Sequence, residues 1–127
     1  MAGKAPYLEF TPRRDHADAS IAALQNWVEA HLDTPRPVEE MSARSGLTRR
    51  TLERRFRSAI GYPPIAYLQQ LRIHRARRLL ERTPMPVEQV GFAVGYLNIA
   101  HFRRVFQRTT HLTPGAYRRR FGGPPRP

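Results

Sequence analysis

The chain contains an internal duplication, which constrains its fold more than any other feature of the sequence. Residues 38–46 recur as residues 87–95, and residues 56–67 recur as residues 106–117, with glycine, phenylalanine, proline and tyrosine in matching places. The copies are offset by 49 residues before the glycine and by 50 residues after it, so the second turn carries one extra residue. A chance match would not stay in register on both sides of an insertion, and the sequence therefore predicts two copies of one small unit.

Each copy has the pattern of a helix-turn-helix. In the first copy, a short helix over about residues 37–45 precedes Gly46, which accepts a positive φ in the turn without a Cβ clash. Thr48 then serves as the N-cap of a second helix over about residues 49–60. The matching features of the second copy are Pro86 at a helix start, Gly95 in the turn, Asn98 as N-cap and a helix that ends at about Thr110.

Apolar periodicity predicts three further helices. A first helix begins at Asp18 or Ser20 and ends near Thr34, a long helix covers about residues 65–82, and a short helix covers 114–121. At 1.5 Å per residue the long helix spans roughly 27 Å, which makes it a rigid connector. The residues expected in the core are Trp27, Leu52, Phe56, Tyr67, Phe102, Phe106 and Tyr117.

We therefore expect an all-α protein of about seven helices, in which two homeodomain-like helix-turn-helix subdomains are joined by a long linker helix. The expected domains are an N-terminal tail or linker (1–17), a first helix-turn-helix lobe (18–64), the linker helix (65–82), a second lobe (83–121) and a disordered tail (122–127).

Charge is unevenly distributed along the chain. Residues 1–40 carry four basic and seven acidic side chains, whereas residues 41–127 carry eighteen basic and three acidic ones. Such a field favours a polyanion as partner. All basic residues except Lys4 are arginine, which suits bidentate contacts with phosphate or guanine; codon bias in a GC-rich genome is an equal explanation of this ratio, but not of the asymmetry.

Several classes of protein are disfavoured by the composition. The absence of cysteine excludes disulfides and thiolate zinc sites. The scattered histidines and acids form no HExxH motif, paired carboxylates or nucleophile elbow, so we expect no enzyme, no metal site and no cofactor. No apolar run approaches the ~18 residues that span a membrane, and no secretory signal is recognisable. We expect a protein of the cytoplasm that associates with the nucleoid and not with a membrane.

A set of motifs extends over residues 20–121. They are Ser45-Gly46-Leu47-Thr48 with Leu52, Arg55 and Phe56; Gly61-x-x-Pro64-x-x-Tyr67-Leu68 with Arg72; Ala76-x-x-Leu79-Leu80; Val94-Gly95-Tyr96; Phe102-Arg103-x-x-Phe106; and Thr113-Pro114-x-x-Tyr117-Arg118. Together they resemble the DNA-binding domain of the AraC/XylS family of bacterial transcription regulators. The resemblance implies a sequence-specific regulator, such as an activator, whose two recognition helices enter adjacent major-groove segments of double-stranded DNA.

The sequence departs from the pattern of this family at a few positions. The family usually has glycine where this chain has His111, and a non-glycine residue in a left-handed helix cap costs roughly 1 kcal/mol. Leu97 stands where a small polar residue is common, and Ser42 and Gly91 replace a usual alanine at the helix crossings. The family also usually carries a sensor or dimerisation domain. The chain is therefore either a minimal regulator or a C-terminal fragment, and the linker-like residues 1–17 favour the fragment.

The first recognition helix carries the clearer base-reading candidates. Arg50 and Arg54 are four residues apart on one exposed face and can each donate two hydrogen bonds to guanine, while Glu53 can accept one from cytosine. Arg49 belongs to the same base-reading set, although its place near the rim also suits phosphate. Arg57, at the rim, is assigned to phosphate. The alternative is that this arginine stripe only solvates the helix.

We call each helix-turn-helix copy, with its recognition helix, a head. In the second head, the resemblance places four base-reading candidates on the groove face: Ile99, Ala100, His101 and Arg104. Ile99 and Ala100 are suited to thymine methyl groups, whereas a surface or packing role is equally expected for His101. The phosphate candidates, besides Arg57, are Arg36, Arg44, Arg103 and Arg108, with a weaker expectation for 118–120. Backbone N–H groups at the helix starts near Val38 and Val87 are further phosphate donors.

Two alternatives remain open at this stage. A sequence-indifferent architectural protein that binds DNA or RNA would need only the basic charge. The domain could also serve mainly to contact RNA polymerase or a missing N-terminal sensor domain, with DNA binding secondary.

Overall fold

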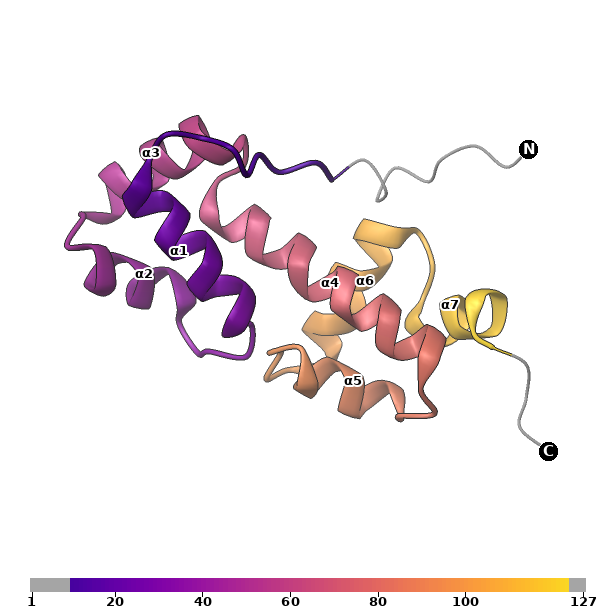
Figure 1. Ribbon diagram of the computed structural model, residues 1–127. Coiled ribbons are helices and arrows are strands. Elements are labelled where there is room, and N and C mark those ends of the chain that lie inside the picture. The colour runs from indigo at the N-terminus through magenta and orange to yellow at the C-terminus, as the bar shows by residue number, and fades with distance from the viewer. Residues whose placement is uncertain (1–9, 124–127) are drawn as a thin grey trace. The chain divides into compact units, whose positions relative to one another are not determined.

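The computed structural model describes residues 10–123, which form α-helices and no strands (Figure 1). The helices are α1 (Ala19–Ala30), α2 (Pro37–Ser45), α3 (Arg49–Ile60), α4 (Pro64–Arg82), α5 (Val87–Ala93), α6 (Ile99–Thr110) and α7 (Pro114–Phe121). The predicted all-α fold of about seven helices is confirmed for this part of the chain. The predictions for residues 1–9 and 124–127 lie outside the described residues.

The described residues form two compact units, and the division falls inside α4, between Leu71 and Arg72. The core of the first unit contains Ile21, Leu24, Val28, Leu32, Val38, Met41, Leu52, Phe56, Ile60, Tyr67 and Leu68. The core of the second contains Ile73, Ala76, Leu80, Val90, Val94, Tyr96, Phe102, Val105, Phe106 and Tyr117. The helix expected to be a separate linker thus supplies core residues to each unit. Of the residues expected in the core, Trp27 is only half-buried.

Side-chain caps fix where four of the helices begin. In α1, α3, α6 and α7 the residue before the helix accepts a hydrogen bond from the backbone N–H three positions later. The donor and acceptor atoms are 2.9–3.2 Å apart. Each such cap satisfies a backbone donor that the first turn leaves unpaired and contributes about 1 kcal/mol. The four capping residues are Asp18, Thr48, Asn98 and Thr113.

Residues in the left-handed backbone conformation occupy the turns that the repeat predicts. Gly46 and Gly95 have φ values of 71° and 107° in the two helix-turn-helix turns. At the ends of α3 and α6, Gly61 and His111 have φ values of 95° and 65°. The His111 N–H donates to the carbonyl of Gln107 at 2.8 Å, as Gly61 does to its own helix. The second recognition helix therefore ends in the same way as the first, despite the histidine.

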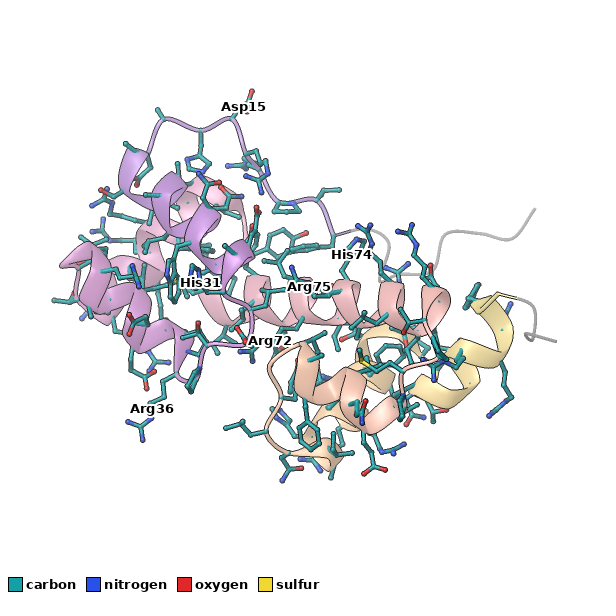
Figure 2. All side chains as sticks on the ribbon, turned by 60° about the horizontal axis from the view of Figure 1, so that its bottom comes forward. Asp15, His31, Arg36, Arg72, His74 and Arg75 are labelled. Atoms are coloured by element: carbon teal, nitrogen blue, oxygen red, sulfur yellow. The ribbon has the colours of Figure 1, made fainter. Side chains whose placement is uncertain are left out.

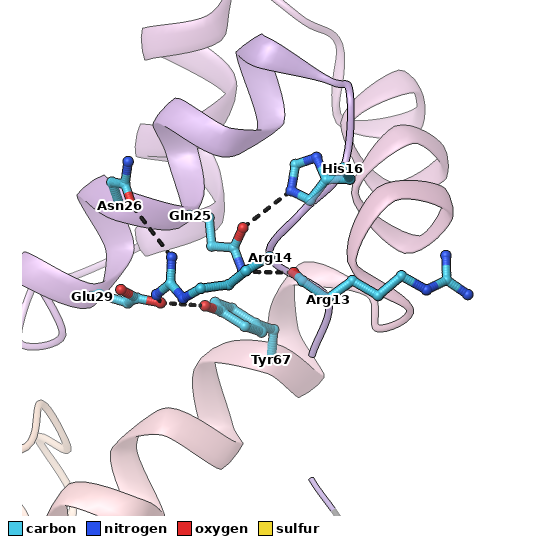
Figure 3. Close-up of polar contacts among 7 residues, drawn as sticks. All are labelled: Arg13, Arg14, His16, Gln25, Asn26, Glu29 and Tyr67. Carbon is cyan, nitrogen blue, oxygen red and sulfur yellow. Dashed lines mark hydrogen bonds and ion pairs between the residues drawn. The ribbon is translucent and has the colours of Figure 1, made fainter. Parts of the chain in front are cut away.

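The segment before α1 packs against the first unit from Phe10 onward. The Phe10 ring lies 4.9 Å from the Tyr62 ring and 5.8 Å from the Tyr67 ring. The Arg13 N–H donates to the Ile60 carbonyl at 3.0 Å, and the Gln25 amide donates to the Arg13 carbonyl at 3.0 Å (Figure 3). Residues 10–17, which the sequence analysis assigned to a tail or linker, are thus held to the first unit by backbone and aromatic contacts.

Buried tyrosines occupy equivalent places in the two units. The Tyr67 hydroxyl donates to the Glu29 carboxylate at 2.8 Å, and Arg14 forms an ion pair with the same carboxylate (Figure 3). Burial, with the Glu29 hydrogen bond second, raises the pKa of Tyr67 well above its usual range. The Tyr117 hydroxyl donates to Glu81 in the second unit, and burial raises the pKa of Tyr117 to about 12. The repeated tyrosine therefore has a structural role.

Candidate nucleic-acid interface

The arginine stripe on α3 faces solvent because the opposite side of the helix is fully buried. Leu52, Phe56 and Ile60 have no exposed surface. Their spacing of four residues turns one side of the helix toward the core, and the charged positions fall on the other side. The five candidates that α3 carries are all exposed: Arg49, Arg50, Glu53, Arg54 and Arg57.

The charged side chains of α3 are not equally available. The Arg49 Nε lies 3.0 Å from the Glu53 Oε1 in an exposed ion pair between neighbouring turns of the helix. Among residues 10–123, neither Arg50 nor Arg54 forms an ion pair. Arg50 and Arg54, like Arg57, can therefore reach a ligand without first breaking an ion pair.

Arg55 has a structural role on the same helix. Its Nε and Nη2 atoms donate to the two carboxylate oxygens of Asp18 at 3.0 and 2.7 Å. These hydrogen bonds hold the pKa of the Asp18 carboxyl below its usual value. Because Asp18 also caps α1, this contact fastens the recognition helix to the start of α1.

The corresponding face of α6 is less polar. Ile99 is half-buried, whereas the other candidates on this helix are exposed: Ala100, His101, Arg103, Arg104 and Arg108. A Cβ added at Gly91 would lie 2.9 Å from the Ile99 Cδ1, so the end of the Ile99 side chain turns toward α5. The His101 ring packs edge-on against Tyr96, with ring centroids 5.5 Å apart. Two of the predicted base-reading residues thus already have packing partners.

Repeat symmetry also reveals one residue that the sequence analysis did not single out. Gln107 is exposed on α6 and matches Arg57 of the first copy. The offset of 50 residues after the turn was the signal that would have identified it.

The predicted phosphate-contacting residues differ in their surroundings. Arg36 immediately precedes α2 in the left-handed conformation, with φ of 50°, and it extends away from the ribbon into solvent (Figure 2). The Arg44 Nε lies 3.2 Å from the Glu40 Oε1, and the Arg44 Cζ lies 4.6 Å from the centre of the Trp27 ring. Glu39 and Glu40 lie in the first turn of α2, where their charge opposes anion binding at this helix start.

Arg118 differs from its two arginine neighbours in α7. Its guanidinium donates to the carbonyls of Leu80 and Thr83 at 3.2 and 3.1 Å, which joins α7 to the end of α4. Arg119 and Arg120 are exposed. The weak expectation of phosphate contacts in this segment therefore applies to those two residues more than to Arg118.

Most of the exposed candidates are arginines on helical surfaces. Within residues 10–123, no group of three or more His, Asp or Glu side chains is arranged to hold a metal ion. In the same part of the chain, no helix combines the length and apolar character required to cross a membrane.

Comparisons with known proteins agree with this geometry. The sequence profile of a helix-turn-helix domain family matches residues 41–120. The regulatory protein SoxS of Salmonella typhimurium is 31% identical over 100 residues, which cover 79% of this chain and 94% of SoxS. The chain belongs to the AraC family of helix-turn-helix transcription regulators. This AraC-family chain is also 32% identical to the transcriptional regulator MtrA of Neisseria gonorrhoeae over 102 residues, which cover 78% of this chain.

A solved structure supports the same assignment. The DNA-binding domain of AdpA, a global transcriptional factor crystallised with a target DNA, is 34% identical and superposes with a TM-score of 0.77. The match covers 80% of this AraC-family chain and 92% of the AdpA domain. The predicted family, the fold and the expectation of a regulator instead of an enzyme are thereby confirmed. The match covers 34% of MtrA, so the chain spans about a third of that relative.

Proposed function

We propose that this domain recognises its operator by placing α3 and α6 in adjacent segments of the major groove. The observation that carries the proposal is the equivalence of Arg54 and Arg104, which occupy matching, exposed positions of the two recognition helices. A major groove about 12 Å wide admits one α-helix, and grooves on the same face of DNA recur every ~34 Å. The continuous helix α4 and the likeness to AdpA, whose domain was solved with DNA, support two heads that act together.

Within this proposal the residues divide by the chemistry they offer. Arg50, Arg54 and Arg104 donate to guanine O6 and N7, and Glu53 accepts from a cytosine amino group. Glu53 must first release Arg49, but an exposed pair of this kind contributes only about 0.3–0.5 kcal/mol, less than the ~1–3 kcal/mol of a good base contact. The proposed phosphate contacts are Arg36, Arg44, Arg57, Arg103 and Arg108.

The wider role of the protein is also part of the proposal. We infer a transcription activator of the bacterial cytoplasm, bound to the nucleoid, which contacts RNA polymerase when it occupies its operator. A sensor or dimerisation domain would precede the described residues, as the larger size of MtrA suggests. Sequencing of the gene upstream of Met1 tests the last point directly.

Selection of bound sequences from a random DNA pool, followed by competition at physiological salt, tests the central proposal. The selected site should outcompete random duplex by ~10³ or more. Arg54→Ala should cost about 1–3 kcal/mol of binding free energy and relax the preference at one base pair. Arg57→Ala, the matched control on the same helix, should weaken specific and random DNA equally and reduce the salt slope by about one.

Two outcomes would contradict the proposal. A preference near one for the selected site would favour an architectural protein that binds nucleic acid without regard to sequence. Two separately acting heads would be indicated if inserting about five base pairs, half a helical turn, between the recognised segments left the affinity unchanged.

A further inference from the structure

The second helix-turn-helix turn contains a residue that has no counterpart in the first. Tyr96 is buried in the place of Leu47, and Asn98 caps α6 as Thr48 caps α3. Leu97, between them, is therefore the inserted residue. Its side chain is 85% exposed, the largest value among the exposed large hydrophobic residues of the described chain.

The backbone on both sides of Leu97 is held in place. The Tyr96 N–H donates to the Gly91 carbonyl at 3.0 Å, and the Asn98 side chain accepts from the His101 N–H at 2.9 Å. The Tyr96 ring is 4% exposed and lies 5.4 Å from the Phe102 ring. The fold thus presents Leu97 at a fixed position directly before the recognition helix, which limits the entropy lost when the side chain is covered.

The start of α6 differs chemically from the start of α3. Ile99 and Ala100 occupy the places of Arg49 and Arg50, so that Leu97 precedes a first turn whose first two side chains are apolar. Such side chains cannot donate hydrogen bonds to base edges. The apolar group that bases present in the major groove is the C5 methyl of thymine.

We infer that Leu97 contacts thymine methyl groups and adds thymine recognition to the second head, in which Arg104 reads guanine as Arg50 and Arg54 do in the first head. The inference rests on the proposed function. The occupant is DNA and not an apolar protein surface, because Arg103 and Arg108 are exposed on the same helix and give it positive charge beyond the apolar start. Phosphates on either side of a major groove satisfy that charge.

Substitution of thymine by 2′-deoxyuridine tests this inference, because it removes the methyl group and leaves base pairing intact. The selected operator is prepared as a series of duplexes, each with one thymine replaced, and each is titrated with the wild-type protein and with Leu97→Ala. For the wild type, replacement at the positions under Leu97 should weaken binding about four-fold for each methyl group lost. With Leu97→Ala, the same replacements should change the affinity by less than about two-fold.

A matched control separates Leu97 from apolar exposure in general. Phe92 is 51% exposed on α5. Phe92→Ala should keep the wild-type sensitivity to deoxyuridine, and circular dichroism should show unchanged folding for both variants because neither residue belongs to the buried core. The inference is supported if Leu97→Ala alone abolishes the sensitivity.

The other outcomes overturn the inference, and they identify which step failed. A wild-type protein that binds thymine and deoxyuridine sites equally, or an operator without thymine, excludes methyl recognition while the regulator proposal stands. Equal sensitivity in the wild type and in Leu97→Ala assigns the methyl contact to another residue. If no preferred sequence emerges from the selection, the proposed function itself is wrong, and thymine recognition falls with it.

Discussion

Gly91→Ala should destabilise the second unit, even though alanine is the better helix former. In α5 the exchange gains about 1 kcal/mol of helix propensity. The new Cβ, however, would lie 2.8 Å from the Phe102 Cδ2 and 3.0 Å from its Cγ. Phe102 is completely buried, so its ring cannot move without displacing other core residues.

The balance of these two effects gives the expected magnitude. Overpacking a buried site costs typically 1–3 kcal/mol. The Ile99 Cδ1, 2.9 Å from the new Cβ, is the end of a half-buried side chain and can rotate away, so the Phe102 ring accounts for most of the cost. With a cost of about 2 kcal/mol and a gain of about 1 kcal/mol, we expect a net loss of about 1 kcal/mol.

Urea titration followed by circular dichroism measures this loss, and Gly115→Ala is the matched control. A Cβ at Gly115 in α7 would meet only the Arg119 Nη1 at 3.5 Å, an ordinary contact. This variant should therefore gain about 0.5–1 kcal/mol. If Gly91→Ala proves as stable as the wild type or more so, the close approach of α5 and α6 described here is incorrect.

Three further predictions concern stability. His111→Gly should gain about 1 kcal/mol of folding stability by relieving the left-handed cap, and Gly61→Ala should lose a similar amount. A rise in the melting temperature of both variants would contradict this reasoning. Phe56→Ala should cost ~3–5 kcal/mol in urea titration, whereas near-wild-type stability would mean that the side chain is not in the core. Burial raises the pKa of Tyr117 from 10.0 to about 12, so the native state holds this proton more tightly. The contribution of this proton to the free energy of unfolding should be full below pH 10 and should decline as the pH rises toward about 12. Tyr117→Phe should flatten that decline, and an unchanged dependence of stability on pH in this variant would refute the prediction.

Local signals made the helices predictable. Thr48, Asn98 and Thr113 each precede a helix and cap it with their own side chain, which requires only residues three positions away. Gly46 and Gly95 mark the turns because few other residues accept a positive φ. The exposed arginines of α3 could be predicted from helical periodicity, because the buried face of the helix repeats every three or four residues.

The properties that sequence reasoning missed depend on contacts between distant residues. Phe10 lies in a segment that looked like a linker, yet its ring packs on Tyr62 and Tyr67. Ile99 has the sequence position of a base reader, but the glycine at position 91 leaves room into which its end turns. No local pattern announces such contacts, because they exist only after the helices have packed.

The sequence by itself determined where the helices begin, that the helix-turn-helix occurs twice, and which side of each recognition helix carries arginine; the first helix, however, ends at Ala30 and not near Thr34. Those properties depend on neighbours within a few residues along the chain. Only the tertiary structure decided that Arg55 is bound to Asp18, 37 residues away, while Arg54 next to it is left exposed. Availability for DNA is set by which distant groups the packed helices bring within hydrogen-bonding distance, and adjacent arginines with the same chemistry therefore have different roles.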